Sequence, residues 1–514
     1  MKYKKKIIIL VVSLVTLLAA QLAINTIPNQ LPNTSRAIIF IASVIGAIIF
    51  VNFEHVKHLP RNAFVIILFL GIGISIIKPI QFGLDEETHL TWAIRLADGQ
   101  LFARETMVQP DWNTVERYDS LRKPNAVHTK NGFSREFLNE KHEPSTYSGK
   151  ITGVNNIGEI PNALGWAVGR LVSSRIFVSY YLGRIFNVLA YALMAFLALK
   201  LGKKYREVIF LFAVFPTNLW IIAGFQYDWL YYGLSMLIIG LLTRFFSDEK
   251  VSRKNLSLYL LATTLMIFPK FPYVLMGILP LFISKDKFVK AKDKLFYGLA
   301  TLGSFLIAVL WYVSPKLIRH FSQATVESKP TVITNAVDAT YFIKHPFPII
   351  RTFINDGLGS LSNFSGSDIS KNPPAPLYYA QHGSQIVNAM LPLVFVVLLV
   401  LATVRLDFQV SKKIKLVFIG IYMIISFLVI YAMAGDNRVG FNAGDLYIKG
   451  VQFRYFYLML MTLPIIFGDG LRKLFPVNYH DSETADLAVS QHLQISLFYI
   501  NVFIMSVAIY VLIS

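Results

Sequence analysis

The chain of 514 residues contains no cysteine and few charged residues, and both absences restrict what it can be. Without cysteine there can be neither a disulfide nor a thiolate metal site. Only 15% of the residues are charged and 54% are hydrophobic, whereas soluble domains carry about 25% charged residues. This composition excludes soluble enzymes, disordered scaffolds and fibrous proteins, and it predicts a helix bundle embedded in lipid.

Several signatures of soluble chemistry are also missing. The chain has no HExxH, GxSxG, P-loop or dinucleotide-binding motif, so ATP-driven transport would need a partner that supplies the motor. No internal repeat is evident, which weakens the case for a transporter built from duplicated halves. The net charge is +19. Because most Lys and Arg lie in short runs between apolar stretches, we expect a lipid bilayer and no nucleic acid as partner.

Long apolar stretches dominate what is present. A spanning helix needs about 20 mostly apolar residues, and the sequence predicts an all-α integral membrane protein with about thirteen transmembrane helices, eleven at the least. The predicted spans are 7–27, 37–53, 63–80, 176–199, 207–223, 229–246, 256–268, 273–284, 295–313, 388–404, 416–434, 453–468 and 495–513. Two of them, 256–268 and 273–284, are short and flank a Pro-Lys-Phe-Pro turn, so half-helices packed against protein are the alternative.

The distribution of basic residues predicts the orientation. The start MKYKKK indicates an uncleaved anchor in preference to a signal peptide. With the N-terminus in the cytoplasm, seven inside segments hold 25 of the 49 Lys and Arg residues, and the short outside loops hold 5. Because cytoplasmic loops of membrane proteins are rich in Lys and Arg, we expect a multi-pass protein of the cell membrane with its C-terminus outside.

This topology divides the chain into five parts. They are three helices in 1–80, a large outside loop in 81–175, helices four to nine in 176–313, a second outside loop in 314–387 and helices ten to thirteen in 388–514. Loops longer than about 15 residues are usually functional or disordered. In the first loop, 164–177 has one apolar helical face and is expected at the membrane interface. In the second, 359–376 suits a mobile cover or, equally, a rigid cap.

Acidic residues follow the third span directly. Asp85 and Glu86 would begin a helix at the outer surface, with His89 four residues after Asp85 on the same helical face. A carboxylate there could act as general base on an acceptor hydroxyl or hold a divalent cation. The structural alternative is that Asp85 caps the helix. Asp228, in a short outside loop, faces the same compartment and is a second candidate, with helix capping again as the alternative.

Basic residues lie at membrane depth near the same side. Lys270 interrupts an apolar region, Arg454 opens the twelfth span with Gln452 and Tyr455 beside it, and Arg184 lies about two turns inside the fourth span. An ionisable residue at such depth needs a partner, such as a lipid phosphate or a buried carboxylate. Snorkelling to the interface is the alternative for Lys270. Two isolated histidines, His128 and His142, are expected to be solvated surface residues.

Several stretches of the sequence resemble those of a known family and occur in the same order along the chain. LDEETHLTWAIRLADGQLF (84–102), the segment 160–189, and the segments 214–238, 268–281 and 449–466 match those of a bacterial family of polytopic predicted membrane proteins, the domain-of-unknown-function family 2142. Phe453 departs from it by standing where Gly is common. That family is similar to the GT-C superfamily of membrane glycosyltransferases, which take sugars from polyprenyl-phosphate carriers outside the membrane.

The resemblance implies a function and roles for particular residues. Asp85, with Glu86 as its neighbour, would be the catalytic base, and Lys270 and Arg454 would bind the donor phosphate. The implied activity is sugar transfer from a polyprenyl-phosphate donor to an extracytoplasmic cell-envelope glycan, with inversion at the anomeric carbon. No cofactor is required, and a divalent cation, Mg or Mn, is optional. The alternatives are a lipid-linked glycan flippase, an envelope polysaccharide polymerase or ligase, and an accessory subunit of an envelope-synthesis complex.

Overall fold

The computed structural model describes most of the chain. The described residues are 2–20, 34–53, 56–83, 85–118, 136–248, 250–322, 344–348, 350–352, 354–355, 385–406, 410–434, 451, 453–475 and 482–511. Of the second predicted outside loop, 314–387, these ranges include only short pieces, and residues 359–376, predicted to form a mobile cover or a rigid cap, lie outside the described residues.

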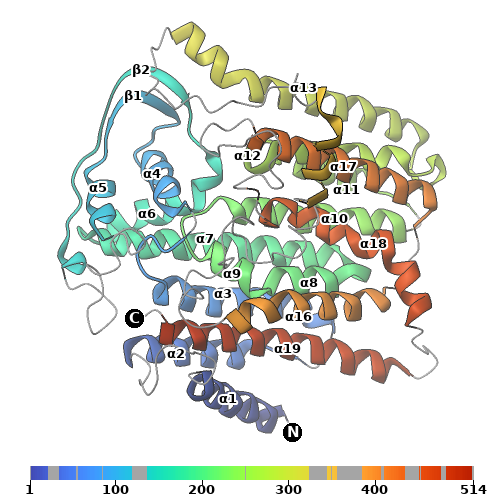
Figure 1. The fold of residues 1–514 in the computed structure, drawn as a ribbon, viewed down its shortest axis with the longest axis horizontal. Coiled ribbons are helices and arrows are strands. Elements are labelled where there is room, and N and C mark those ends of the chain that lie inside the picture. The colour runs from blue at the N-terminus through green and yellow to red at the C-terminus, as the bar shows by residue number, and fades with distance from the viewer. Residues whose placement is uncertain are drawn as a thin grey trace.

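The described chain is mostly helical, and its long helices run side by side as a bundle (Figure 1). The helices of the bundle are α1 (Lys2–Ala19), α2 (Thr34–Phe50), α3 (Leu59–Ile77), α7 (Ile176–Leu201), α8 (Arg206–Val214), α9 (Pro216–Ile222), α10 (Asp228–Ser247), α11 (Arg253–Leu265), α12 (Ile267–Lys270), α13 (Ala291–Ser322), α16 (Gln385–Val404), α17 (Lys412–Ala434), α18 (Tyr457–Leu474) and α19 (Ser482–Val511). Short 3₁₀ segments connect several of them, including η5 (Lys203–Tyr205), η6 (Phe271–Phe282) and η9 (Phe453–Phe456).

Each of the thirteen predicted spans overlaps a helix, but fewer are long enough to cross a membrane. Within the described residues, seven helical segments have the length and apolarity of a span, one of them the folded-back segment Arg253–Phe282, and the bent pair α8–α9 would be an eighth. That pair bends by 59° at Phe215–Pro216, because proline removes a backbone donor and clashes with the preceding turn. The protein is therefore a multi-pass helical membrane protein, and the count of thirteen stays a prediction.

The apolar segment Arg253–Phe282 folds back on itself. The Tyr259 hydroxyl donates to the carbonyl of Met276 at 2.8 Å, and the Val251 amide donates to the carbonyl of Lys287 at 2.7 Å. These contacts require α11 and η6 to run in opposite directions, with Lys270 at the turn between them. The arrangement matches the expectation of two short half-spans on either side of the Pro-Lys-Phe-Pro sequence.

The predicted first loop, 81–175, forms a structured unit at one end of the bundle. It contains α4 (Glu86–Ala97), α5 (Pro110–Arg117), α6 (Ile160–Val172) and an antiparallel hairpin of β1 (Phe102–Val108) and β2 (Thr146–Val154). The prediction of an all-α protein is therefore wrong at this hairpin, which curves over one edge of the molecule (Figure 1). We call this the hairpin end.

The helix α6 connects the hairpin end to the bundle. A Cβ atom at Gly165 or Gly169 would collide with the backbone of α7, so these glycines allow the two helices to pack closely, as small residues four apart do in membrane helix pairs. On another face of α6, Leu164, Leu171 and Val172 are exposed. This exposed apolar face fits the predicted position of 164–177 at the membrane interface.

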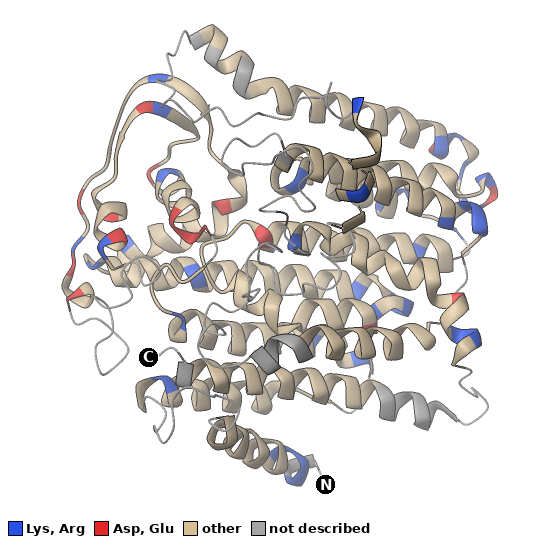
Figure 2. Cartoon of the chain, viewed as in Figure 1, with Lys and Arg blue, Asp and Glu red and all other residues tan. Residues whose placement is uncertain are grey.

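Charge separates the two ends of the bundle. Lys and Arg concentrate at the end opposite the hairpin, whereas most Asp and Glu lie at the hairpin end (Figure 2). Two basic residues of predicted inside segments contact the end of α2: Lys6 donates to the carbonyl of Ile49 at 2.6 Å and Arg61 to that of Phe50 at 2.6 Å. In Figure 1 the N-terminus lies at the lower edge of the molecule, at the end of α1 that is farther from the hairpin, and the C-terminus lies on the hairpin side.

Candidate functional site

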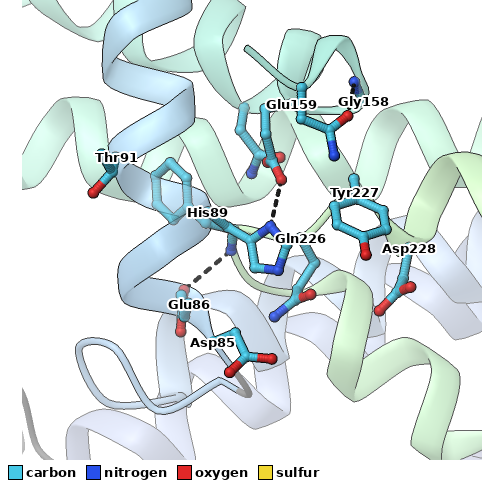
Figure 3. A network of polar contacts seen from close by, with 12 residues as sticks. Asp85, Glu86, His89, Thr91, Gly158, Glu159, Gln226, Tyr227 and Asp228 are labelled. Carbon is cyan, nitrogen blue, oxygen red and sulfur yellow. Dashed lines mark hydrogen bonds and ion pairs between the residues drawn. The ribbon is translucent and has the colours of Figure 1, made fainter. Parts of the chain in front are cut away.

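Four segments that are far apart in sequence meet at the hairpin end. They are the start of α4, the start of α10, the tip of the α11–η6 hairpin and the short helix η9. Each contributes one charged residue, and these are Asp85, Asp228, Lys270 and Arg454, which we call the four-charge site. All four were candidates from sequence, and Figure 3 shows Asp85 and Asp228 in the network that surrounds the site.

Asp85 precedes α4 in a left-handed conformation with φ of 55°, and its side chain makes no capping hydrogen bond. Asp tolerates this conformation better than most residues. The side chain is 64% exposed and lies 3.5 Å from Nη2 of Arg454. The structure therefore does not support the capping role that was the structural alternative. Instead, the carboxylate is accessible beside a buried cation.

Arg454 forms a buried ion pair with Asp228. Its Nη1 donates to Oδ2 of Asp228 at 2.7 Å, and both side chains are at most 5% exposed. Among the described residues, the second oxygen of Asp228 and Nε of Arg454 find no hydrogen-bond partner. Buried polar atoms are usually satisfied, so these atoms mark a place where a further polar group could bind.

Tyrosine side chains hold η9 in position. The hydroxyls of Tyr231 and Tyr273 both donate to the carbonyl of Tyr455, at 2.9 and 2.5 Å. Tyr231 comes from α10, which begins at Asp228, and Tyr273 comes from η6, which directly follows Lys270, so the backbone next to Arg454 is fixed by segments adjacent to both charged residues. Gln452, the remaining candidate of this stretch, lies outside the described residues.

Lys270 lies between two aromatic rings. Its Nζ is 4.0 Å from the ring centre of Tyr455 and 5.3 Å from that of Tyr227, and it donates to the Tyr227 hydroxyl at 3.4 Å. In the described part of the chain, Lys270 makes no ion pair. Aromatic faces stabilise an ammonium group without neutralising it. Lys270 is therefore a positive charge that remains able to bind an anion.

Glu86, the neighbour of Asp85, lies in a different environment. It is fully buried and accepts from Nε and Nη2 of Arg184 at 2.8 and 3.0 Å, and from the amide of Phe225 at 3.1 Å. Burial by itself would raise the pKa of Glu86, but Arg184 and the nearby Lys78 hold it below its ordinary value. The partner that Arg184 needs is thus a buried carboxylate, one of the two predicted possibilities.

This buried pair joins the elements around the site. Arg184, on α7, also donates to the carbonyls of Ser75, Lys78 and Pro79 at the end of α3. A Cβ atom at Gly224 would lie 2.7 Å from Nζ of Lys78 and 3.2 Å from Oε1 of Glu86, so a larger residue there would have to push the Lys78 side chain aside. The pair therefore fixes the start of α4, next to Asp85, relative to the turn that carries Asp228.

His89 forms a buried pair with Glu159. Its Nδ1 lies 2.6 Å from Oε1 of Glu159, and its other ring nitrogen points toward the space between Gln226 and Asp85 (Figure 3). Burial raises the pKa of Glu159, the nearby Asp228 adds to this, and His89 opposes it. Sequence reasoning missed Glu159, because an acid before an apolar helix is an ordinary N-terminal residue. Only the tertiary contact with His89 distinguishes it.

A second polar network stabilises the hairpin end. Asp111 accepts from Arg170 at 2.9 Å and lies 2.7 Å from Nδ1 of His142, whose Nε2 is 2.9 Å from the hydroxyl of Ser179. The prediction that His142 is a solvated surface residue is therefore wrong, since Asp111 is buried and orients it. His128 lies outside the described residues.

No group of three or more His, Asp or Glu side chains in the described ranges is placed to hold a metal ion. The carboxylates of Asp85 and Asp228 are instead separated by the guanidinium of Arg454. As it stands, the four-charge site is suited to binding an anion beside an accessible carboxylate.

Comparisons with known proteins identify the family of the chain. A family model described as Predicted membrane protein (DUF2142) matches residues 68–463, a range that includes all of the four-charge site. Neither a curated protein nor a solved structure matches the chain.

Proposed function

The chain belongs to the DUF2142 family of predicted membrane proteins, and from this premise we propose that it is a glycosyltransferase that uses a polyprenyl-phosphate sugar donor. The acceptor is a cell-envelope glycan on the outer side of the membrane. The observation that carries the proposal is the four-charge site, where the exposed carboxylate of Asp85 lies beside one buried and one aromatic-bound cation. A lipid-linked phosphate donor and a hydroxyl acceptor need that combination.

In the proposed reaction, Asp85 takes the proton of an acceptor hydroxyl. The acceptor oxygen then attacks the anomeric carbon, and the bond from that carbon to the phosphate oxygen breaks. The electron pair leaves with the polyprenyl phosphate, so negative charge grows on that phosphate in the transition state. A fixed cation beside it lowers the barrier. Because the acceptor displaces the phosphate directly, the anomeric configuration inverts.

The two cations have different roles in this scheme. Arg454 already pairs with Asp228 and contacts Asp85, so its main effect is to orient the Asp85 carboxylate. Lys270 has aromatic neighbours and no ion pair within the described residues, so we assign it to the departing phosphate. Tyr455 holds Lys270 through its ring and contributes to the same subsite.

Glu86 and His89 support the site from behind. Glu86 is fully buried in its pair with Arg184, so we assign it a positioning role in place of the predicted catalytic one. Glu159 holds Nδ1 of His89, which leaves the other ring nitrogen directed toward the site to bind a sugar hydroxyl. A divalent cation, if used, would have to bind together with the substrate.

Envelope glycans of cells with and without the protein test this function. We expect loss of one side-chain sugar on deletion, restored by the wild-type chain and by Glu143→Gln, an exposed acid of the same region, but not by Asp85→Asn. Equal abundance of the three proteins in the membrane is the control. A short or missing polymer would point instead to a polymerase, a ligase or a flippase.

A further inference from the structure

The basic end of the bundle contains a cavity that the proposed reaction does not use. Its volume is about 330 Å³, and it lies between the start of α1, the residues that follow α2, and α19. Lys5, Lys6 and His492 are its basic lining residues, and the lining includes neither Asp nor Glu. Among the described residues, the charge of this cavity is therefore entirely of one sign.

The rest of the lining is mostly apolar. Ile9, Val51 and Phe53 are buried in the wall, and Ile495 from α19 completes it. Lys6 donates to the carbonyl of Ile49 at 2.6 Å, which fixes the start of α1 against the end of α2. Lys5 and His492, in contrast, are exposed at the rim. The cavity thus combines a basic rim with an apolar interior.

We propose that this cavity binds the head group of an anionic phospholipid. The phosphate would contact Lys5, Lys6 and His492, and the first carbons of an acyl chain would lie against Ile9 and Val51. Basic pockets between transmembrane helices on the cytoplasmic side bind such head groups, and the volume lies in the range of ligand pockets, about 300 to 1,000 Å³. A soluble anion would use the basic rim but would leave the apolar wall without a partner.

This inference is independent of sugar transfer. The lining residues Val51 to Phe53 precede α3, whereas Asp85 follows it, so the cavity and the four-charge site lie beyond opposite ends of that helix. A lipid in the cavity would bridge α1 and α19, which come from the two ends of the chain. Its expected effect is to hold α1 on the bundle.

Lipid binding to the purified full-length chain tests the proposal. Native mass spectrometry would compare retention of phosphatidylglycerol with that of phosphatidylcholine for the wild type, Lys5→Gln and Lys4→Gln. Lys4 is exposed, adjacent in sequence and outside the cavity lining, so its substitution removes the same charge at a different position. We expect Lys5→Gln to weaken phosphatidylglycerol binding about fivefold, as for the loss of one basic contact, and Lys4→Gln to change it less than twofold.

Two further measurements distinguish loss of the lipid site from a folding defect and from binding of free phosphate. His492→Gln, on a separate helix, should also weaken phosphatidylglycerol binding, so a folding defect of one variant does not hide the result. Glycerol phosphate, added at the same concentration as phosphatidylglycerol, should not displace the bound lipid. If it does displace the lipid, the cavity is a site for free phosphate. Equal effects of Lys4→Gln and Lys5→Gln, or equal retention of both lipids, would overturn the proposal.

Discussion

Asp85 and Glu86 show how much two adjacent acids can differ. The Asp85 side chain is 64% exposed, whereas Glu86 is completely buried. A carboxylate that takes a proton from a substrate must be accessible. A carboxylate in a buried ion pair stabilises the fold, because removal of one partner leaves the other charge buried without compensation. Asp85 therefore has the environment of a catalytic acid, and Glu86 that of a positioning acid.

The substitution Glu86→Gln tests this separation. We expect it to destabilise the protein by roughly 3 to 5 kcal/mol, because Arg184 loses its buried partner. Thermal unfolding in detergent should show a lower midpoint for Glu86→Gln and an unchanged midpoint for Asp85→Asn. If Glu86→Gln kept wild-type stability but lost function, Glu86 would be catalytic and the positioning role would be wrong.

The pH dependence of stability tests the pairing of Asp111. Burial would raise the pKa of Asp111, but His142, the Glu143 amide and Arg170 hold it below its ordinary value of 3.8. Because the folded-state pKa is lower than the unfolded one, this stabilisation is complete above about pH 4 and is lost as the pH falls through the folded-state pKa.

The wild-type protein should therefore lose more stability than Asp111→Asn as the pH falls from about 5 to about 2, in steps of about one unit. Thermal unfolding measured along that series gives the two slopes. Glu86 contributes with the same sign to both proteins, so the difference isolates Asp111. Parallel curves would contradict the pairing.

Sequence reasoning named all four residues of the four-charge site but few of the contacts that support them. Asp85, Lys270 and Arg454 flank apolar stretches, and a membrane boundary fixes the depth of a flanking residue even when its tertiary contacts are unknown. Glu159 and the Glu86–Arg184 pair depend on contacts between distant segments, which no local pattern encodes. The β1–β2 hairpin was missed for the same reason: residues 109–145 separate its strands, so no short turn signals it.

At the scale of elements, close packing of α6 on α7 connects the hairpin end to the bundle. Both Gly165 and Gly169 face the backbone of α7, and the nearest atoms around Gly165 include the carbonyl of Leu182. Main-chain atoms cannot move aside as a flexible side chain can. The position of α6, and with it Glu159 at its start, therefore depends on these glycines.

Gly165→Leu should destabilise the protein by about 3 kcal/mol or more, because the larger side chain forces α6 away from α7. The matched control is Gly303→Leu in α13, where a Cβ atom meets nothing within 4 Å. We expect this control to stay within about 0.5 kcal/mol of the wild type. The comparison is made by unfolding in detergent, and similar losses for both variants would contradict the role of the α6–α7 contact.

At the scale of the whole molecule, the absence of cysteine allows the orientation to be measured directly. The basic end should lie in the cytoplasm and the hairpin end outside. Single cysteines introduced on the cysteine-free chain report on this without background. Ser148 on β2 and Lys203 on η5 are both exposed. Ser148 belongs to the hairpin end, whereas Lys203 follows the far end of α7, the helix that starts at the hairpin end.

We expect Ser148→Cys to react with a membrane-impermeant maleimide in intact cells. Lys203→Cys should react only after the membrane is permeabilised. The reverse pattern would place the four-charge site in the cytoplasm and would exclude an extracytoplasmic acceptor.

The measurement that tests the central claim most directly is sugar transfer by the purified protein in lipid nanodiscs. Polyprenyl-phosphate sugars and an envelope glycan fraction are supplied, and the new glycosidic bond and its anomeric configuration are determined. The account predicts an inverted product from the wild type, and a loss of at least about 100-fold with Asp85→Asn, as expected for removal of a general base. Full transfer by Asp85→Asn, or movement of the donor between leaflets with no new bond, would contradict it.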